Sequence, residues 1–343
     1  MKKLVLTCVL AAGWSNLALA QGITLYGILD AGVGYSRQAG SRSDITIDSG
    51  SSDDSRIGLR GSEELRAGLK ANFVLESGVD LDTGTSTEEE KFYNRDAWIG
   101  LEGGFGELRL GRHPTFTYDW FTDLSPFGND YRQASTETVF GYEAIGSRVD
   151  NSVFFFSPRF GGVEAGIGYS FNDDGPEAAE ENNRVVSLGL RYERGPVTAV
   201  ASYEVRRDAD EDAGPGRADV RNLSVGATYE FSRVKLHAGY GRLKNREFSE
   251  AARTEKAWMI GTSVQLGSGQ LLAAYQRVSN RNLNEFGIDA RRDGFAVAYE
   301  HSLSKRTTLY VYGSRFRAAD VRSDDESRLA ARVEFGSGVR FMF

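Results

Sequence analysis

The sequence has few of the residues that hold many exported or catalytic proteins together. Its 343 residues include one cysteine, six prolines and three histidines. The cysteine, Cys8, lies within the first twenty residues, so no disulfide can stabilise the rest of the chain. The histidines, His113, His237 and His301, occur in neither metal-binding nor nucleophile-elbow spacings, so the sequence does not favour hydrolytic or metal-dependent catalysis.

Long hydrophobic runs are also missing. Beyond the first twenty residues no apolar stretch reaches the about 20 residues that a membrane helix needs. The mean hydropathy is negative, as in soluble proteins, but membrane strands that alternate apolar and polar residues give the same average. Forty glycines and many Tyr and Phe residues disfavour a long-helix protein. A formal net charge of −7 disfavours nucleic acid as a partner.

The N-terminus has the pattern of a secretory signal peptide. Met1-Lys2-Lys3 is basic, Leu4 to Ala12 is apolar, and Ala18-Leu19-Ala20 is a small-x-small cleavage site. We therefore predict a signal peptide over residues 1–20 and a mature chain over 21–343. A single membrane anchor is the alternative, but Ser15 and Asn16 interrupt the apolar run too early.

The C-terminal stretch, residues 329–343, alternates apolar with polar or small side chains. Its apolar positions are Leu329, Ala331, Val333, Phe335, Val339, Phe341 and Phe343. A period of two predicts a β-strand with one apolar face. The run exceeds the about 5–6 residues of a globular strand and suits the about 9–11 residues of a tilted transmembrane strand. We predict that Phe341 and Phe343 form a membrane assembly signal at the interface.

Turn signals recur along the chain at regular intervals. Clusters of turn residues are centred near 65, 105, 159, 195, 232, 268 and 304 and have hairpin length. Two alternating runs around each of seven turns, with the first run (23–35) and the last, make sixteen strands. This pattern predicts an all-β fold, a 16-stranded antiparallel transmembrane β-barrel with short periplasmic turns and long extracellular loops. The alternation is ambiguous over 95–101 and 307–316, where both faces carry aromatic residues.

One interval is longer than the others and contains segment 113–147, which is rich in aromatic rings. Its rings are Phe116, Tyr118, Trp120, Phe121, Phe127, Tyr131, Phe140 and Tyr142. Large apolar surfaces are normally hidden or used, and a long loop is usually functional. Because a sixteen-stranded barrel leaves an aqueous channel, we predict that this third loop folds into the lumen and narrows it. An exposed surface loop or a crossover to another subunit is the alternative.

The narrowing is predicted to set charged groups on the loop against charged groups on the wall. The loop contributes Asp119, Asp123, Asp130 and Glu137. Strand alternation and position place five cations on the wall: Arg56, Arg60, Arg95, Arg148 and Lys70. Opposed charges across a water-filled gap create a transverse field that sets ion preference. The alternative is that the wall arginines pair with carboxylates of the wall itself.

Short motifs follow one another in a characteristic order along the mature chain. They are Thr24-Leu25-Tyr26-Gly27, Ser55-Arg56-Ile57-Gly58-Leu59-Arg60-Gly61, Leu110-Gly111-Arg112, Ser157-Pro158-Arg159-Phe160-Gly161 and the terminal Phe343. With these motifs in this order, the chain resembles the trimeric general-diffusion porins of Gram-negative outer membranes, of the beta-proteobacterial type. The resemblance implies a homotrimer and a third loop folded into the pore. It also implies that Arg56, Arg95 and Arg148 match the basic cluster of the wall, and that Asp123 and Asp130 match loop acids.

The sequence departs from that family in ways that leave the charge preference open. Pro126-Phe127-Gly128 lacks the glutamate that enteric relatives carry in this loop, and Ile28 stands where some relatives have a wall lysine. The expected function is an outer-membrane channel for passive diffusion. Its expected partners are two further copies, outer-membrane lipid and lipopolysaccharide, and small hydrophilic solutes and ions, with no nucleic acid, cofactor or metal. A substrate-specific porin with inward Tyr310 and Tyr312 as a binding ladder is one alternative; a barrel enzyme is a remote one.

Overall fold

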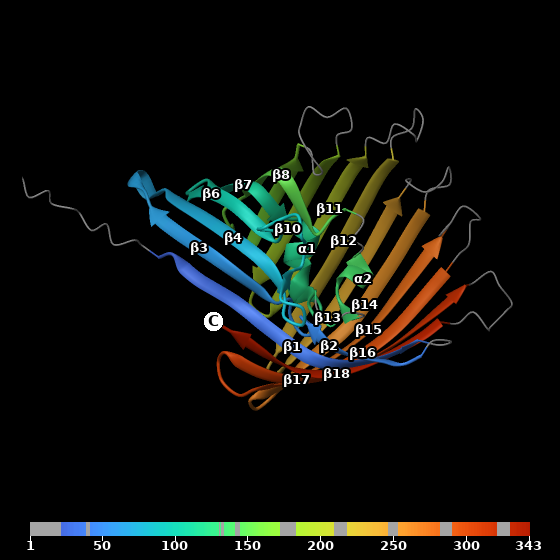
Figure 1. Cartoon of the computed structure of the whole chain (residues 1–343). Coiled ribbons are helices and arrows are strands. Elements are labelled where there is room, and N and C mark those ends of the chain that lie inside the picture. Colours follow the sequence, from blue (N-terminus) through green and yellow to red (C-terminus); the bar gives the residue numbers. More distant parts are fainter. Residues whose placement is uncertain are drawn as a thin grey trace, which may run out of the picture.

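The chain folds into a closed ring of antiparallel strands (Figure 1). The structure, a computed structural model, describes residues 22–38, 42–129, 131, 134–140, 145–171, 183–208, 218–245, 253–281, 290–320 and 330–343. Eighteen strands occur in these ranges; two short ones, β2 (Asp44–Ser49) and β5 (Thr85–Ser86), belong to loops, and the other sixteen form the ring. Each ring strand pairs with the next along the chain, and β18 pairs with β1 to close the ring. The predicted barrel is confirmed.

The ring strands are long, and each connects to its neighbour by either a short turn or a longer loop. In chain order they are β1 (Thr24–Gln38), β3 (Arg56–Glu64), β4 (Lys70–Asp80), β6 (Asp96–Gly103), β7 (Gly106–Pro114), β8 (Arg148–Phe156), β9 (Val163–Ser170), β10 (Arg184–Arg194), β11 (Val197–Asp208), β12 (Ala218–Phe231), β13 (Val234–Asn245), β14 (Arg253–Leu266), β15 (Gly269–Arg281), β16 (Ala290–Ser302), β17 (Thr307–Asp320) and β18 (Ala330–Met342). The seven short connections fall at the predicted turn centres.

Side chains alternate between the outside and the inside of the ring along each strand, as the period of two predicts. On β18, Phe335 is 56% exposed on the outside, whereas the neighbouring Glu334 is 2% exposed on the inside. The ambiguous strand β17 follows the same rule, with Leu309 exposed and Tyr310 buried. The ring closes at the C-terminus, where the backbones of Phe343 and Gly27 exchange two hydrogen bonds of 3.1 Å.

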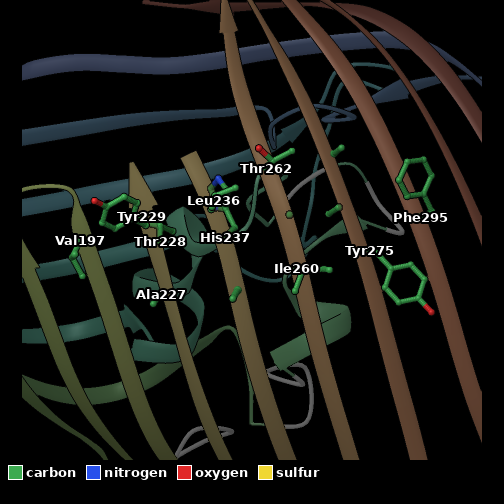
Figure 2. Close-up of a pocket in the computed structure, with 14 residues that line it drawn as sticks. Val197, Ala227, Thr228, Tyr229, Leu236, His237, Ile260, Thr262, Tyr275 and Phe295 are labelled. Atoms are coloured by element: carbon green, nitrogen blue, oxygen red, sulfur yellow. The ribbon is translucent and has the colours of Figure 1, made fainter. Parts of the chain in front are cut away.

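The outer wall is hollowed between β11 and β16 (Figure 2). Small residues there pair directly across neighbouring strands, Ala227 with Ala238 and Thr262 with Ala273. Larger side chains border a groove of about 760 Å³, among them Tyr229, Leu236, Ile260, Tyr275 and Phe295. This apolar lining suits the hydrocarbon side of the wall.

The helical segments are short and lie mainly inside the ring. One turn of 3₁₀ helix, η1 (Arg66–Gly68), caps the β3–β4 connection, while α1 (Phe116–Phe121), η2 (Thr122–Leu124) and α2 (Glu137–Phe140) lie in the interior (Figure 1). Among the described residues no helix has the length and apolar character to span a membrane. The strand β7 continues through Pro114, which pairs with Arg148 after a bulge at Gly111. The inner loop therefore covers residues 115–147, two fewer than predicted.

Glycines on the inner wall form sockets for side chains of the inner loop. A Cβ added at Gly239 would lie 2.5 Å from Phe140 Cζ, and one at Gly189 would lie 2.7 Å from both Phe116 and Trp120. Both distances are too short for a real carbon–carbon contact, so only glycine permits this close approach. The wall is thus shaped to receive the loop.

We expect Gly239→Leu to displace α2 from the wall. Overpacking of this kind typically lowers the stability of a protein by about 1–3 kcal/mol. Because the wall is fixed by its strand pairing, we expect the loop to move. Limited proteolysis should cleave within 115–147 faster than in the unaltered protein. Gly104→Leu is the matched control, since a Cβ there meets nothing within 4 Å; equal cleavage rates in the two variants would contradict the socket.

Candidate functional site at the inner loop

Aromatic rings fix the first part of the inner loop to the wall. Phe116 packs edge-on against Phe154 and Phe156 of β8, with centroid distances of 5.4 and 5.5 Å, and Trp120 lies 4.5 Å from Phe116. All four rings are buried. Aromatic pairs of this kind contribute about 0.5–1.5 kcal/mol beyond the burial of their area. Phe116 and Trp120, two of the rings that the sequence marked as unusual for a surface loop, therefore pack inside the barrel, whereas Tyr142 lies outside the described residues.

The middle of the loop is held by a second group of rings. Tyr131 lies edge-on to Tyr310 and Tyr312 of β17, with centroid distances of 5.9 and 5.4 Å. Its hydroxyl donates a 2.5 Å hydrogen bond to Glu300, and burial together with this carboxylate raises the pKa of Tyr131 well above its ordinary value. Tyr310 in turn donates to Asp30 (2.7 Å). Since Tyr310 and Tyr312 are buried under the loop, they do not offer an open ladder to solutes.

Polar groups of the inner wall bind the loop backbone. The carboxylate of Glu204 accepts hydrogen bonds from the Thr117 amide (3.0 Å) and from Ser187 Oγ (2.7 Å). The side-chain amides of Asn222 and Gln276 donate to the carbonyls of Phe140 and Ala134, each at 2.7 Å. These buried bonds replace water for groups that a loop inside a barrel would otherwise leave unpaired.

Opposite this packing, arginines and carboxylates of the wall form one group. We name it the wall charge cluster: Arg56, Arg95, Arg148, Asp53, Asp54, Glu76 and Asp96. Arg95 binds Glu76 (Nε–Oε1, 2.6 Å) and Asp54 (Nη1–Oδ2, 2.8 Å). Arg56 binds Asp53 at 2.7 Å and lies 3.8 Å from the same Glu76. Burial lowers the pKa of Arg95, but Tyr118 and the two carboxylates outweigh it, so its pKa is raised well above normal.

Arg148 connects the wall charge cluster to the inner loop. Its guanidinium lies over the ring of Tyr118 on α1 at 4.5 Å from the centroid and donates to the Tyr118 hydroxyl at 3.3 Å. Its Nε lies 3.9 Å from the Asp96 carboxylate of the wall. The cation–π contact contributes about 0.5–2 kcal/mol depending on hydration. One arginine therefore faces both the loop and a wall carboxylate.

The remaining predicted residues lie at different places. Arg60 is exposed above the Tyr26 ring (5.1 Å), four residues nearer the short turn than Arg56. Lys70 pairs with Glu64 at 3.5 Å at the short-turn end of the wall, so neither Arg60 nor Lys70 joins the wall charge cluster. The ring of Phe341 stacks on Phe343 at 6.2 Å beside the closing pair of strands.

The loop acids are only partly within the described residues. Asp123 on η2 and Asp119 on α1 are both exposed. Although its carboxylate is open to the lumen, Asp119 lies deep inside the ring, where reduced hydration raises its pKa against the opposing effect of nearby arginines. Asp130 lies outside the described residues, and Glu137 begins α2 with its side chain outside them.

Sequence reasoning missed the carboxylates of the wall charge cluster. Strand alternation carried the signal for Glu76, which shares the inward parity of Lys70, and Asp53 and Asp54 directly precede Arg56. The position of a residue in the alternation indicates which way its side chain faces, but not which residue it contacts. The contacts match the alternative in which wall arginines pair with carboxylates of the wall.

A closed ring of sixteen antiparallel strands with an apolar outside, a polar inside and an inserted loop defines a channel-forming barrel of the outer membrane. Residues 6–320 match the Gram-negative porin family, and the chain belongs to that family. An outer membrane porin protein of Bordetella pertussis is 30% identical, with both chains covered completely. The protein is thus an outer-membrane porin, and its location is the outer membrane.

Solved structures share the fold. The anion-selective porin from Comamonas acidovorans superposes with a TM-score of 0.78 at 25% identity, covering 94% of this chain and 99% of that one. OmpT of Vibrio cholerae, in its trimer form, gives a TM-score of 0.71 at 18% identity, covering 94% and 99%.

Proposed function

We propose that the protein lets ions and small hydrophilic solutes diffuse passively through a lumen narrowed by residues 115–147. The packing of this loop on the inner wall carries the proposal, because it leaves the exposed Asp119 and Asp123 in the same lumen as the wall charge cluster. Diffusion without a solute-specific ladder is favoured over a substrate-specific porin, since Tyr310 and Tyr312 are buried.

We further propose that the channel prefers cations. The wall charge cluster holds four carboxylates and three arginines, and each arginine already lies within 4 Å of a carboxylate. Asp119 and Asp123 add two exposed carboxylates, and Arg109 and Arg191 are two further arginines near Asp119, so six carboxylates and five arginines meet here, with one negative charge in excess. A paired guanidinium attracts passing anions weakly, whereas unbalanced carboxylates attract cations. The porin from Comamonas acidovorans is described as anion-selective, and we propose the opposite preference here.

No enzymatic activity belongs to this proposal. His237 bonds to the Leu124 carbonyl (3.2 Å) and to Ser263 Oγ (3.0 Å), and His113 stacks on Phe154 at 4.5 Å. The His237 ring joins the loop to the wall, and the His113 ring packs between two strands of the wall, β7 and β8. We also propose that residues 1–20 are removed as a signal peptide and that three copies assemble, as in the trimer form of the Vibrio cholerae OmpT. Mature protein should begin at Gln21 by N-terminal sequencing, and its mass in detergent should be that of a trimer.

Swelling of proteoliposomes in sugars of increasing size tests the diffusion proposal. Arabinose, glucose and raffinose should enter at rates that fall steadily with size and rise linearly with concentration. Protein-free liposomes are the control. A rate that saturates for one sugar, or that exceeds the rate of a smaller sugar, would favour a substrate-specific porin instead.

A further inference from the structure

A polar cavity lies between the inner loop and the short-turn ends of the strands. Its volume is about 240 Å³, and its lining includes Ser52, Asp123, Lys235, Gln270, Glu300 and Arg340. Lys235 and Gln270 each lie within two residues of a short turn, and short turns mark the periplasmic end of such a barrel. The cavity is therefore on the periplasmic side of the loop, and it borders the wall charge cluster at Ser52, the residue before Asp53. We name it the periplasmic pocket.

Two of the four charges in the periplasmic pocket are already paired. Arg340 donates to Ser52 Oγ (2.8 Å) and lies 3.4 Å from the carboxylate of Glu300, which also accepts the hydrogen bond of Tyr131 (2.5 Å). These contacts fix the arginine and the glutamate in place. They form a rigid side of the pocket.

The other two charges, Asp123 and Lys235, have no such partner. Within the described part of the chain, neither the Asp123 carboxylate nor the Lys235 ammonium forms a hydrogen bond or an ion pair. They come from different elements, η2 and β13. A cation and an anion that face one cavity without pairing are suited to a ligand that carries both charges.

The size and lining of the pocket narrow the class of ligand. A cavity of about 240 Å³ is well above the about 10–15 Å³ that one water requires, so it has room for a molecule of the size of a free amino acid. The lining has neutral polar groups that suit a sugar as well as an amino acid, among them Ser52, Ser125 and Gln270, so the distinction rests on whether an open aromatic face is present. The rings in the lining, Phe127 and Tyr131, are 2% and 3% exposed and pack on each other at 5.4 Å.

We propose that the periplasmic pocket binds a small zwitterion of amino-acid size, with its carboxylate on Lys235 and its ammonium on Asp123. The Gln270 amide and the Ser52 hydroxyl lie in the same lining and offer neutral polar contacts. The inference rests on the proposed channel function, because the ligand reaches the pocket through the lumen.

Single-channel recording of the mature protein in planar bilayers tests the inference at constant ionic strength. L-Serine is the zwitterion; lactate carries only the carboxylate, ethanolamine only the ammonium, and glucose neither. Serine should lower the conductance in a saturable way, at a half-effect concentration roughly tenfold below those of lactate and ethanolamine, because two charge-assisted contacts form in place of one. Glucose should have no saturable effect.

Two variants separate the two ends of the ligand. Lys235→Met should abolish the lactate effect, keep the ethanolamine effect, and raise the half-effect concentration of serine roughly tenfold. Asp123→Asn should do the reverse for lactate and ethanolamine. Lys305→Met is the matched control, because it removes one exposed cation from a short turn at the same end of the barrel; its response to serine should be unchanged.

Three results would overturn the inference. Glucose acting as strongly as serine would mean a neutral sugar site. A normally conducting channel with no saturable response to serine would remove the pocket ligand and leave the channel function standing. Trimers that form in detergent but conduct no ions would contradict the channel function and this inference together.

Discussion

Deleting residues 118–140 should raise the single-channel conductance by roughly twofold or more, since an open sixteen-stranded ring leaves an aqueous channel. This segment contains Trp120, Phe121 and Phe140, whose rings fill the sockets and clusters of the inner wall. The ring itself is closed by backbone pairing that does not involve the loop. Conductance measured in planar bilayers checks the prediction.

The deletion must leave the barrel folded for this test to hold. The shift in gel mobility on heating gives the folded fraction, and we expect the deleted protein to retain most of it. Gly239→Leu is a milder perturbation than the deletion, because the loop is still present but is displaced from the wall. A folded deletion variant with unaltered conductance would show that residues 118–140 do not limit ion flow.

The second large effect concerns charge. Asp53→Asn together with Asp54→Asn should move the reversal potential of a salt gradient toward anions, with a change of roughly threefold in the permeability ratio. The two carboxylates bind Arg56 and Arg95 at 2.7 and 2.8 Å. Their loss leaves Glu76 as the carboxylate that both guanidiniums share, so the two arginines attract anions more strongly. Asp54 is 46% exposed on its side chain, so the loss of its ion pair with Arg95 should cost only about 0–1 kcal/mol.

A matched pair of substitutions outside the ring interior controls for net charge. Asp82→Asn with Glu89→Gln removes the same two charges from exposed positions between β4 and β6, and it should leave the reversal potential nearly unchanged. Arg56→Glu with Arg148→Glu should shift the potential in the opposite direction, toward cations. If Asp82→Asn with Glu89→Gln gave the same shift as Asp53→Asn with Asp54→Asn, the ion preference would follow the net charge of the protein and not the wall charge cluster.

Much of the fold was predictable because one physical rule governs every strand. Inside a membrane the backbone is satisfied by its neighbours, and side chains alternate between lipid and lumen. The rule failed to decide β17, where Leu309 and Tyr310 are both large and apolar. Tyr310 faces the lumen, where Tyr131 of the inner loop covers its ring. That contact joins residues far apart in sequence, and alternation carries no information about it.

The candidate site was predictable only in part, for a related reason. Alternation indicated the inward arginines, and aromatic content indicated the inserted loop. The partners of the arginines depend on strand register and on side-chain reach: Arg95 bridges Glu76 on β4 and Asp54 before β3. Nothing in the sequence indicated a role for Lys235, because a lysine beside a turn is common. Only the fold places it in one cavity with Asp123.

The reversal potential of the unaltered protein in a tenfold KCl gradient tests the central claim most directly. Because the arginines are paired and carboxylates are in excess, the channel should prefer cations, and the potential should have the sign set by potassium. A potential of the sign set by chloride would contradict the proposed charge balance, and a membrane that stays electrically silent after insertion would contradict the channel itself.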